Sequence, residues 1–180
     1  AVSSWRFDHH GSIAAFASRF GHDVGMLVLG HRGASAAARE NSPAAFRLAD
    51  RMGADGVELD VRTSPDGQLL VAHDPLPMST DEVQAMGLST FAEVLDVCGD
   101  RLLVNTEIKN WPLDADFDPT MSIVDGVIDT LRRRGQAPRW LISCFHWDTL
   151  QACRAAAPEI ATAWLVMKFD EEVIEQTATG

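Results

Sequence analysis

Carboxylates and a lysine interrupt two otherwise apolar stretches of this sequence, GVELDV and LLVNTEIK. Glu58 and Asp60 are two residues apart in the first stretch, so an extended strand places both carboxylates on one face. Glu107 and Lys109 have the same spacing in the second stretch. Three carboxylates form a hard oxygen ligand set for Mg2+ or Ca2+, and without a cation they would raise one another's pKa. The pattern therefore predicts that Glu58, Asp60 and Glu107 hold a divalent cation.

Two histidines and two basic side chains fall at or near the ends of such stretches. His73 ends the run LLVAH, and His31 and Arg32 directly follow MLVLG. A histidine titrates near neutral pH and can act as a general acid or base. Arg32 and Lys109 supply positive charge for a phosphate group, Arg32 through its bidentate guanidinium. This combination favours phosphoester cleavage over acyl or hydride transfer.

Each of these signals also has an ordinary structural interpretation. A single histidine at a strand end is usually a satisfied polar residue, and Glu107 with Lys109 could be a simple ion pair. Glu40 and Asn41 could serve only the helix entry at Ser42. The Glu58–Asp60 pair is harder to interpret in this way, because two carboxylates on an apolar strand are costly to bury.

The carboxylates of the run DADFD differ from this pattern. Asp114, Asp116 and Asp118 superficially resemble a calcium loop, but the later glycine and the closing glutamate are missing. We interpret the run as an acidic loop that precedes a helix.

Short apolar strands alternate with helical stretches along the chain, and this alternation indicates a parallel sheet covered by helices. Polar residues at the carboxyl ends of such strands lie where active sites are built. An open doubly wound sheet has the same alternation, although neither GxGxxG nor GxxxxGK[ST] occurs. The predicted strands are Met26–Gly30, Gly56–Val61, Gln68–His73, Leu102–Lys109, Trp140–Phe145 and Ala161–Val166. The predicted helices are Pro43–Met52, Thr90–Val97, Pro119–Arg134, Asp148–Ala156 and one that begins near Asp170.

Composition indicates one globular domain. The 180 residues are 46% apolar and 23% charged, and they divide into an irregular segment 1–24 and a folded domain 25–180. A net charge of −11 argues against a nucleic-acid partner. The three cysteines lack CxxC spacing and are interpreted as reduced core thiols. The apolar stretch near the start is too short for a membrane span or a signal core. We therefore expect a cytoplasmic protein without a transmembrane segment, unless a signal precedes Ala1.

Three ordered motifs resemble one known family. The stretch His31–Asp74, which begins HRGAS and ends VAHD, is similar to the N-terminal signature of the glycerophosphodiester phosphodiesterases. NTEIK (Asn105–Lys109) and LISCF (Leu141–Phe145) resemble the fourth and fifth barrel strands of that family. The resemblance implies an α/β fold of the (β/α)8 TIM-barrel type, with about six of the eight strands in this chain.

The resemblance also implies an activity and a set of residue roles. Members of the family hydrolyse glycerophosphodiesters to glycerol 3-phosphate and an alcohol with one divalent cation, Ca2+ or Mg2+. By resemblance, His31 and His73 are the acid–base pair, and Glu58, Asp60 and Glu107 are the cation ligands. Arg32 and Lys109 would bind the phosphate, and Glu40 and Asn41 would support the pocket. The order of the chemical steps is left open: water attacks the phosphate directly, or the glycerol hydroxyl attacks first to give a cyclic phosphate.

Two departures from the family accompany these expectations. The segment between Asp74 and Thr90 is short where many relatives insert a substrate-covering subdomain, so we expect a more open pocket. A barrel needs roughly 250 residues, so we also expect the natural product to continue beyond Gly180. A lysophospholipase D or a phosphoinositide-cleaving enzyme on the same barrel is the alternative activity. A non-catalytic remnant that binds metal or phosphate, and a structural barrel with buried ion pairs, are the alternatives without activity.

Overall fold

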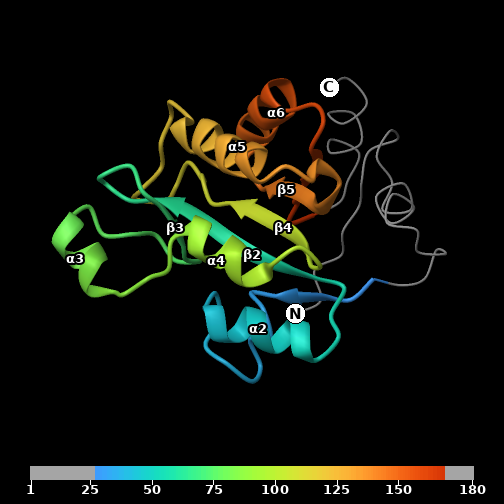
Figure 1. Cartoon of the computed structure of the whole chain (residues 1–180). Helices are drawn as coiled ribbons and strands as arrows, with labels where there is room; N and C mark the ends of the chain where they lie inside the picture. Colours follow the sequence, from blue (N-terminus) through green and yellow to red (C-terminus); the bar gives the residue numbers. More distant parts are fainter. Residues whose placement is uncertain (1–26, 169–180) are drawn as a thin grey trace.

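A six-stranded sheet forms the centre of the molecule, and five of its strands run parallel in the order of the chain. The computed structural model describes residues 27–168. A doubly wound sheet reverses its strand order at a switch point, and the described strands show no such reversal. The winding is therefore that of a TIM barrel, as predicted (Figure 1). The parallel strands are β1 (Leu29–His31), β2 (Gly56–Thr63), β4 (Leu103–Ile108), β5 (Trp140–Cys144) and β6 (Ala161–Trp164).

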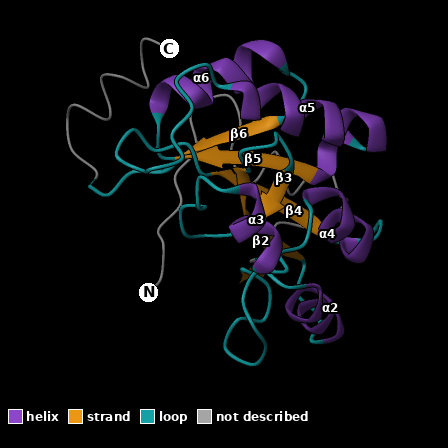
Figure 2. Cartoon of the chain, turned by 90° about the vertical axis from the view of Figure 1, so that its left-hand side faces the viewer, coloured by secondary structure: helices purple, strands orange, loops and turns teal. Residues whose placement is uncertain are grey.

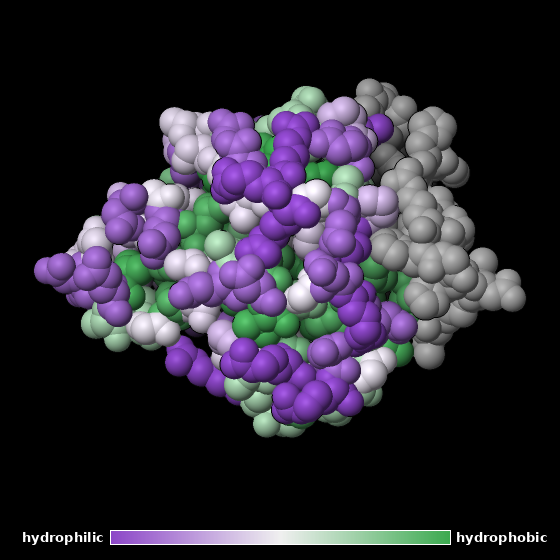
Figure 3. Space-filling model, viewed as in Figure 1, coloured by the Kyte–Doolittle hydropathy of each residue, from purple (hydrophilic) through white to green (hydrophobic). Residues whose placement is uncertain are grey.

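The apolar residues of these strands pack against helices. Leu59, Val104 and Ile142 are fully buried and share one large core cluster with Phe46 of the first helix. Burying an aliphatic side chain of this kind stabilises the fold by about 1.5–3 kcal/mol. The helices lie in an arc around the strands, and their outward surfaces are largely hydrophilic (Figures 2 and 3). They are α2 (Pro43–Arg51), α4 (Phe91–Cys98), α5 (Ser122–Arg134) and α6 (Trp147–Ala156).

Side-chain caps fix the starts of α2 and α4. The Ser42 hydroxyl accepts a hydrogen bond from the Ala45 amide at 3.2 Å, and Pro43 occupies the first turn of α2, as predicted. At α4, Thr90 and Glu93 form a reciprocal capping box. Thr90 was predicted as the first helical residue and is instead the N-cap, since its hydroxyl binds the Glu93 amide.

Helix α5 begins at Ser122 and not, as predicted, at Pro119. The carboxylate of Asp118 accepts hydrogen bonds from the amides of Thr120 and Ser122, both at 2.8 Å. Met121 has a left-handed backbone with φ of 58°, which ends the preceding turn. The acidic loop therefore extends to the first turn of the helix.

The third predicted strand is present as β3 (Leu69–Val71), but it runs antiparallel to β2. Only residues 64–68 connect the two strands, which is too short for a parallel crossover, and the Pro-Asp-Gly turn closes a hairpin instead. The chain then returns along β2, and the Ala72 amide donates a hydrogen bond to the carbonyl of Asp60 at 3.1 Å. The hairpin thus carries His73 back to the site, whereas the sequence placed it at the end of a parallel strand.

The segment after the hairpin contains a short helix that the sequence analysis did not predict, α3 (Thr80–Ala85). Ser79 caps it, and the segment stands apart from the four covering helices in Figure 1. Its side chains Leu76, Val83 and Leu88 form a small apolar cluster together with Leu70 of β3 and the adjoining Ala72. The fold also includes a short 3-10 helix at Ala137–Arg139, which was not predicted either.

Three predictions concern residues outside the described range. They are the irregular segment 1–24, the first residue of the first strand, Met26, and the helix near Asp170. The domain boundary at residue 25 stays a prediction for the same reason. Among residues 27–168, no helix has the length and apolarity needed to span a membrane.

Candidate active site

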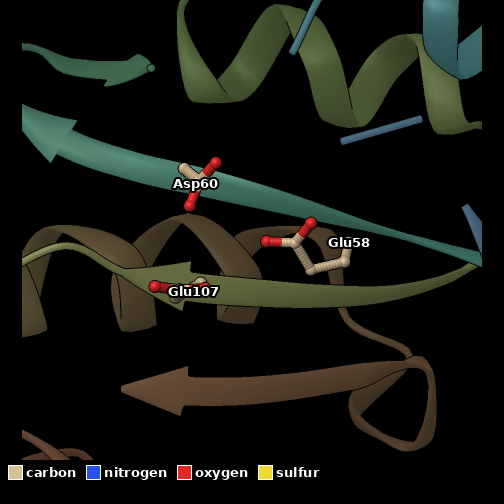
Figure 4. A group of neighbouring side chains, drawn as sticks. All are labelled: Glu58, Asp60 and Glu107. Carbon is tan, nitrogen blue, oxygen red and sulfur yellow. The ribbon is translucent and has the colours of Figure 1, made fainter. Parts of the chain in front are cut away.

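Three buried carboxylates meet on the inner face of β2 and β4. In the register of the two parallel strands, Asp60 lies beside Glu107 and Glu58 lies beside Asn105. Glu58, Asp60 and Glu107 each place one oxygen within 4.8 Å of the others, and their exposed fractions are 2%, 0% and 7%. Figure 4 shows the three side chains on these neighbouring strands. The structure thus brings together the three residues predicted to hold a cation.

Burial disfavours the ionised form of this cluster. Burial, followed by the charges of Asp60 and Glu107, raises the pKa of Glu58 to about 8. Burial also raises the pKa of Glu107, against the opposing effect of Lys109. Among the described residues, no donor forms a hydrogen bond with Oε1 of Glu58 or with Oδ1 of Asp60. Because unpartnered buried oxygens are costly, these carboxylates fit a hard divalent cation, which would supply the missing positive charge.

Two basic side chains lie against the carboxylates. The Nζ atom of Lys109 is 2.8 Å from Oε1 of Glu107 and 3.7 Å from Oδ1 of Asp60. The Nε atom of Arg32 is 3.1 Å from Oδ2 of Asp60, and its Nη1 atom contacts both oxygens of Glu40, at 3.1 and 3.2 Å. The Glu107–Lys109 ion pair is therefore present, but it belongs to a larger charged cluster.

The loop between β1 and α2 is held against this cluster by Asn41. The Nδ2 atom of Asn41 donates to Oδ2 of Asp60 at 2.8 Å, and the Asp60 amide donates to Oδ1 of Asn41 at 3.3 Å. The backbone amide of Arg32 donates to Oε2 of Glu58 at 2.9 Å. Arg32 and Asn41 both have a left-handed backbone with φ of 54°, and their main chains are joined by a hydrogen bond of 3.1 Å. Asn41 thus contacts a carboxylate as well as preceding the helix.

One predicted histidine, His31, contacts the carboxylate cluster, and the other, His73, lines a cavity together with Glu107. The Nε2 atom of His31 is 3.8 Å from Oε2 of Glu58, and its side chain is 55% exposed. Partial burial and then the neighbouring Arg32 lower the pKa of His31. The Nδ1 atom of His73 is 2.8 Å from Oδ1 of Asp74. His73 shares a cavity wall with Glu107 and Lys109, so the two histidines approach the cluster from β1 and from the hairpin.

Two cavities adjoin His73. One, of about 360 Å³, is lined by Glu107 and Lys109 together with the apolar side chains of Trp111, Phe145 and Met167. The other, of about 350 Å³, is lined by His73 together with residues 39–43 and 86–89 among others. Volumes of this size accommodate a small organic ligand.

The sequence analysis did not single out Arg62, which follows Glu58 and Asp60 on the same face of β2. Its side chain is 2% exposed and contacts Asp114 and Asp116 at 2.8 and 2.7 Å. The acidic run was predicted as a loop before a helix, which it is, but two of its carboxylates face this buried arginine. A signal was available, because Arg62 continues the spacing of two residues that identified Glu58 and Asp60.

The sheet and the site together define a protein of the TIM-barrel type with a carboxylate cluster at the carboxyl ends of its strands. A model of the glycerophosphoryl diester phosphodiesterase family matches residues 31–86. The chain is 31% identical over 160 residues to a glycerophosphodiester phosphodiesterase of Caldanaerobacter subterraneus subsp. tengcongensis, an alignment that covers 74% of this chain and 64% of the relative. It spans 61 to 65% of the length of this relative and two further ones.

Solved structures of the same kind share the fold. The glycerophosphodiester phosphodiesterase of Thermotoga maritima matches with a TM-score of 0.67 and 29% identity over 88% of this chain and 70% of its own. A phosphodiesterase of Oleispira antarctica, solved with the product sn-glycerol-3-phosphate, matches with a TM-score of 0.69 and 24% identity over 85% of this chain and 72% of its own. The chain is thus similar, in sequence and in fold, to glycerophosphodiester phosphodiesterases.

Proposed function

We propose that this protein hydrolyses glycerophosphodiesters to glycerol 3-phosphate and an alcohol. One observation carries the proposal: the buried cluster of Glu58, Asp60 and Glu107, with oxygens that accept no hydrogen bond, contacts His31 and shares a cavity wall with His73. The match of residues 31–86 to the family model and the glycerol 3-phosphate bound by the Oleispira antarctica protein, whose fold this chain shares, support this substrate class.

The carboxylates are the proposed ligands of one divalent cation, Ca2+ or Mg2+, which would act as a Lewis acid toward a phosphoryl oxygen. Arg32 and Lys109 are the proposed partners of the phosphate charge, and both lie within 4 Å of Asp60. One histidine takes the proton of the attacking water or glycerol hydroxyl, and the other gives a proton to the oxygen of the leaving alcohol. Glu40 and Asn41 position Arg32 and Asp60 through their hydrogen bonds.

The first test measures glycerol 3-phosphate released from a mixture of glycerophosphodiesters. We expect release with Ca2+ or Mg2+, loss of release with a chelator, and a fall of at least about 100-fold in His31→Ala and Glu58→Gln. Calorimetric titration with the metal should show weakened binding in Glu58→Gln. The matched control is Glu159→Gln, because Glu159 is a surface carboxylate paired with Arg132 away from the site.

Two outcomes would contradict the proposal. Release that persists unchanged in the chelator would separate the activity from the carboxylate cluster. Metal binding without release, in a protein that is folded by circular dichroism, would instead support a non-catalytic binding protein.

The cavity beside Lys109 favours one alternative activity. Its wall joins Glu107 and Lys109 to Trp111, Phe145 and Met167, which suits a diester that carries an apolar acyl chain on its glycerol. Lysophosphatidylcholine and glycerophosphocholine, assayed in competition, separate the two activities. A higher kcat/KM for the lysophospholipid, lowered by Trp111→Ala, would identify a lysophospholipase D.

A further inference from the structure

Arg62 is a charged side chain buried next to the candidate active site. On β2 the side chains of Glu58, Asp60 and Arg62 share one face, so the guanidinium lies one step beyond the carboxylate cluster. Its side chain is 2% exposed, and burying a charge is costly unless every part of it is paired. The contacts of the guanidinium therefore indicate what the residue does.

All three nitrogens of the guanidinium are occupied. Nη1 donates to Oδ1 of Asp116 at 2.7 Å, and Nη2 donates to Oδ2 of Asp114 at 2.8 Å. Nε donates to the backbone carbonyl of His73 at 2.9 Å. Two carboxylates against one guanidinium leave the group with net negative charge, so Arg62 is not a binding site for the substrate phosphate.

The contacts of Arg62 join three segments that are distant in the sequence. They are β2, the chain after the hairpin that begins at His73, and the loop between β4 and α5. The second oxygen of Asp116 also accepts a hydrogen bond from the Leu76 amide at 3.0 Å. Residues 73–76 are thus held at both ends, at the carbonyl of His73 and at the amide of Leu76.

The loop that supplies these carboxylates is itself anchored. The Nδ2 atom of Asn110 donates to the Asp118 carbonyl at 3.0 Å, and Oδ1 of Asn110 accepts from the Asp118 amide at 2.9 Å. These bonds close the loop around Asp114 and Asp116. Arg62 therefore connects His73 to a fixed part of the barrel.

The His73 ring is held less firmly than its backbone. Its side chain is 37% exposed, and it makes a polar contact with Asp74, whose side chain is 90% exposed. An exposed carboxylate fixes a ring weakly, because solvent screens the interaction and both side chains stay mobile. The position of the ring depends chiefly on the backbone at His73.

We propose that Arg62 is a positioning residue that fixes the backbone at His73 and so places the imidazole beside the carboxylate cluster. The inference rests on the proposed function, in which His73 is one of the two acid–base residues. Arg62 acts through His73: it lines the cavity beside Lys109, but its guanidinium nitrogens are bonded to Asp114, Asp116 and the His73 carbonyl and not to the three carboxylates that would hold the cation.

The test compares Arg62→Lys with Arg139→Lys. Arg139 is a matched control, because it is also a buried arginine that donates to backbone carbonyls, but at the opposite end of the strands, beside Leu102 and Gly99. We expect Arg62→Lys to lower kcat by about 10- to 100-fold and to change KM by less than about threefold, because a displaced acid–base group affects the transition state more than substrate binding. Metal affinity should be unchanged, and Arg139→Lys should keep the native kcat.

A double-mutant cycle shows whether Arg62 acts through His73. In a His73→Ala background, Arg62→Lys should cause no further loss of residual activity. An additional 10-fold loss in that background would overturn the proposal. Asp116→Asn, which retains hydrogen-bonding capacity but removes one charge, gives a milder second variant if Arg62→Lys is poorly folded, and the same non-additivity is expected.

A spectroscopic measurement separates this inference from the proposed function. The imidazole signals of His73 are assigned in a 1H–15N spectrum by their loss in His73→Ala. We expect them to shift or broaden in Arg62→Lys and to be unchanged in Arg139→Lys, whether or not the protein releases glycerol 3-phosphate. Unchanged His73 signals in a folded Arg62→Lys protein would overturn the proposal.

Discussion

At the scale of single residues, Asn41 has a central place in the site. It is buried, and its amide group makes two hydrogen bonds with Asp60, one to the carboxylate and one from the backbone amide. The left-handed backbone at Asn41 is tolerated by asparagine better than by most other residues. The residue therefore helps Arg32 and Lys109 to orient the Asp60 carboxylate in the cluster.

We predict that Asn41→Ala weakens the binding of Ca2+ or Mg2+ by about 10- to 100-fold, because loss of a partner that orients a ligand typically has this effect. Calorimetric titration measures the change. The control is Ser42→Ala, which removes the neighbouring helix cap and costs about 1 kcal/mol of stability. An equal loss of metal affinity in both variants would show that Asn41 contributes only to the local fold.

Spacing and chemistry identified Glu58, Asp60 and Glu107 from the sequence, because carboxylates on apolar strands are costly to bury unless they bind a cation or a basic group. Arg62 was missed, although it continues the same alternation. A basic residue at the end of a strand ordinarily faces solvent, and its partners lie 52 and 54 positions further along the chain. No local pattern predicts a contact across such a separation.

At the scale of elements, Asp118 determines where α5 begins. Although partial burial raises its pKa, hydrogen bonds from the side chains and amides of Ser122 and Thr120 lower the pKa to about 2, from an ordinary value of 3.8. A carboxylate whose pKa is depressed by folding stabilises the folded state above its unfolded pKa. This stabilisation is lost as the pH falls through the folded value.

We predict that Asp118→Ala lowers the free energy of unfolding at pH 7 by about 1 kcal/mol, the usual cost of losing such a cap. The difference from the natural protein should disappear between about pH 4 and pH 2, where Asp118 itself becomes protonated. Urea unfolding across this pH range measures the difference in the free energy of unfolding. The control is Asp129→Ala, because Asp129 is an exposed residue of the same helix. A difference that is independent of pH would exclude the carboxylate as its cause.

The parallel strands and the four helices that cover them were predictable, because each has apolar periodicity and a cap or a turn at its boundary. Helix α3 and the hairpin are two of the features that were not predicted. Helix α3 has six residues and one buried apolar side chain, Val83, so its pattern is too short to recognise. The hairpin was misjudged because β3 was treated as a further parallel strand, although the short Pro-Asp-Gly link already excludes a crossover.

At the scale of the whole molecule, the alternation of strands and helices predicts a covered parallel sheet but not its closure. The order β1-β2-β4-β5-β6 separates a barrel from a doubly wound sheet, and hydrogen-bonding order is a property of the folded chain. The family resemblance, and not periodicity, made the barrel predictable.

The burial of all three cysteines gives a measure of global unfolding. Cys98, Cys144 and Cys153 are free and buried, as the sequence predicted, and burial raises the pKa of each thiol to about 12. Because the thiolate is the reactive form, we predict no alkylation by iodoacetamide at about pH 8 in the native state and modification of all three in urea. A cysteine placed at the exposed Met52 is the positive control. Native-state reaction at the rate of that control would show that the core opens locally.

The hairpin has a consequence for how this scaffold can be altered. The cation ligands lie on barrel strands, whereas His73 follows a hairpin whose continuation, residues 74–90, packs with Leu70 and Ala72 in a small apolar cluster that is separate from the main core. Changes in the length or composition of that continuation should therefore leave the main core and the carboxylate cluster intact. Laboratory redesign of substrate choice can graft new segments between Leu76 and Thr90 while the hairpin and the Arg62 contacts stay in place.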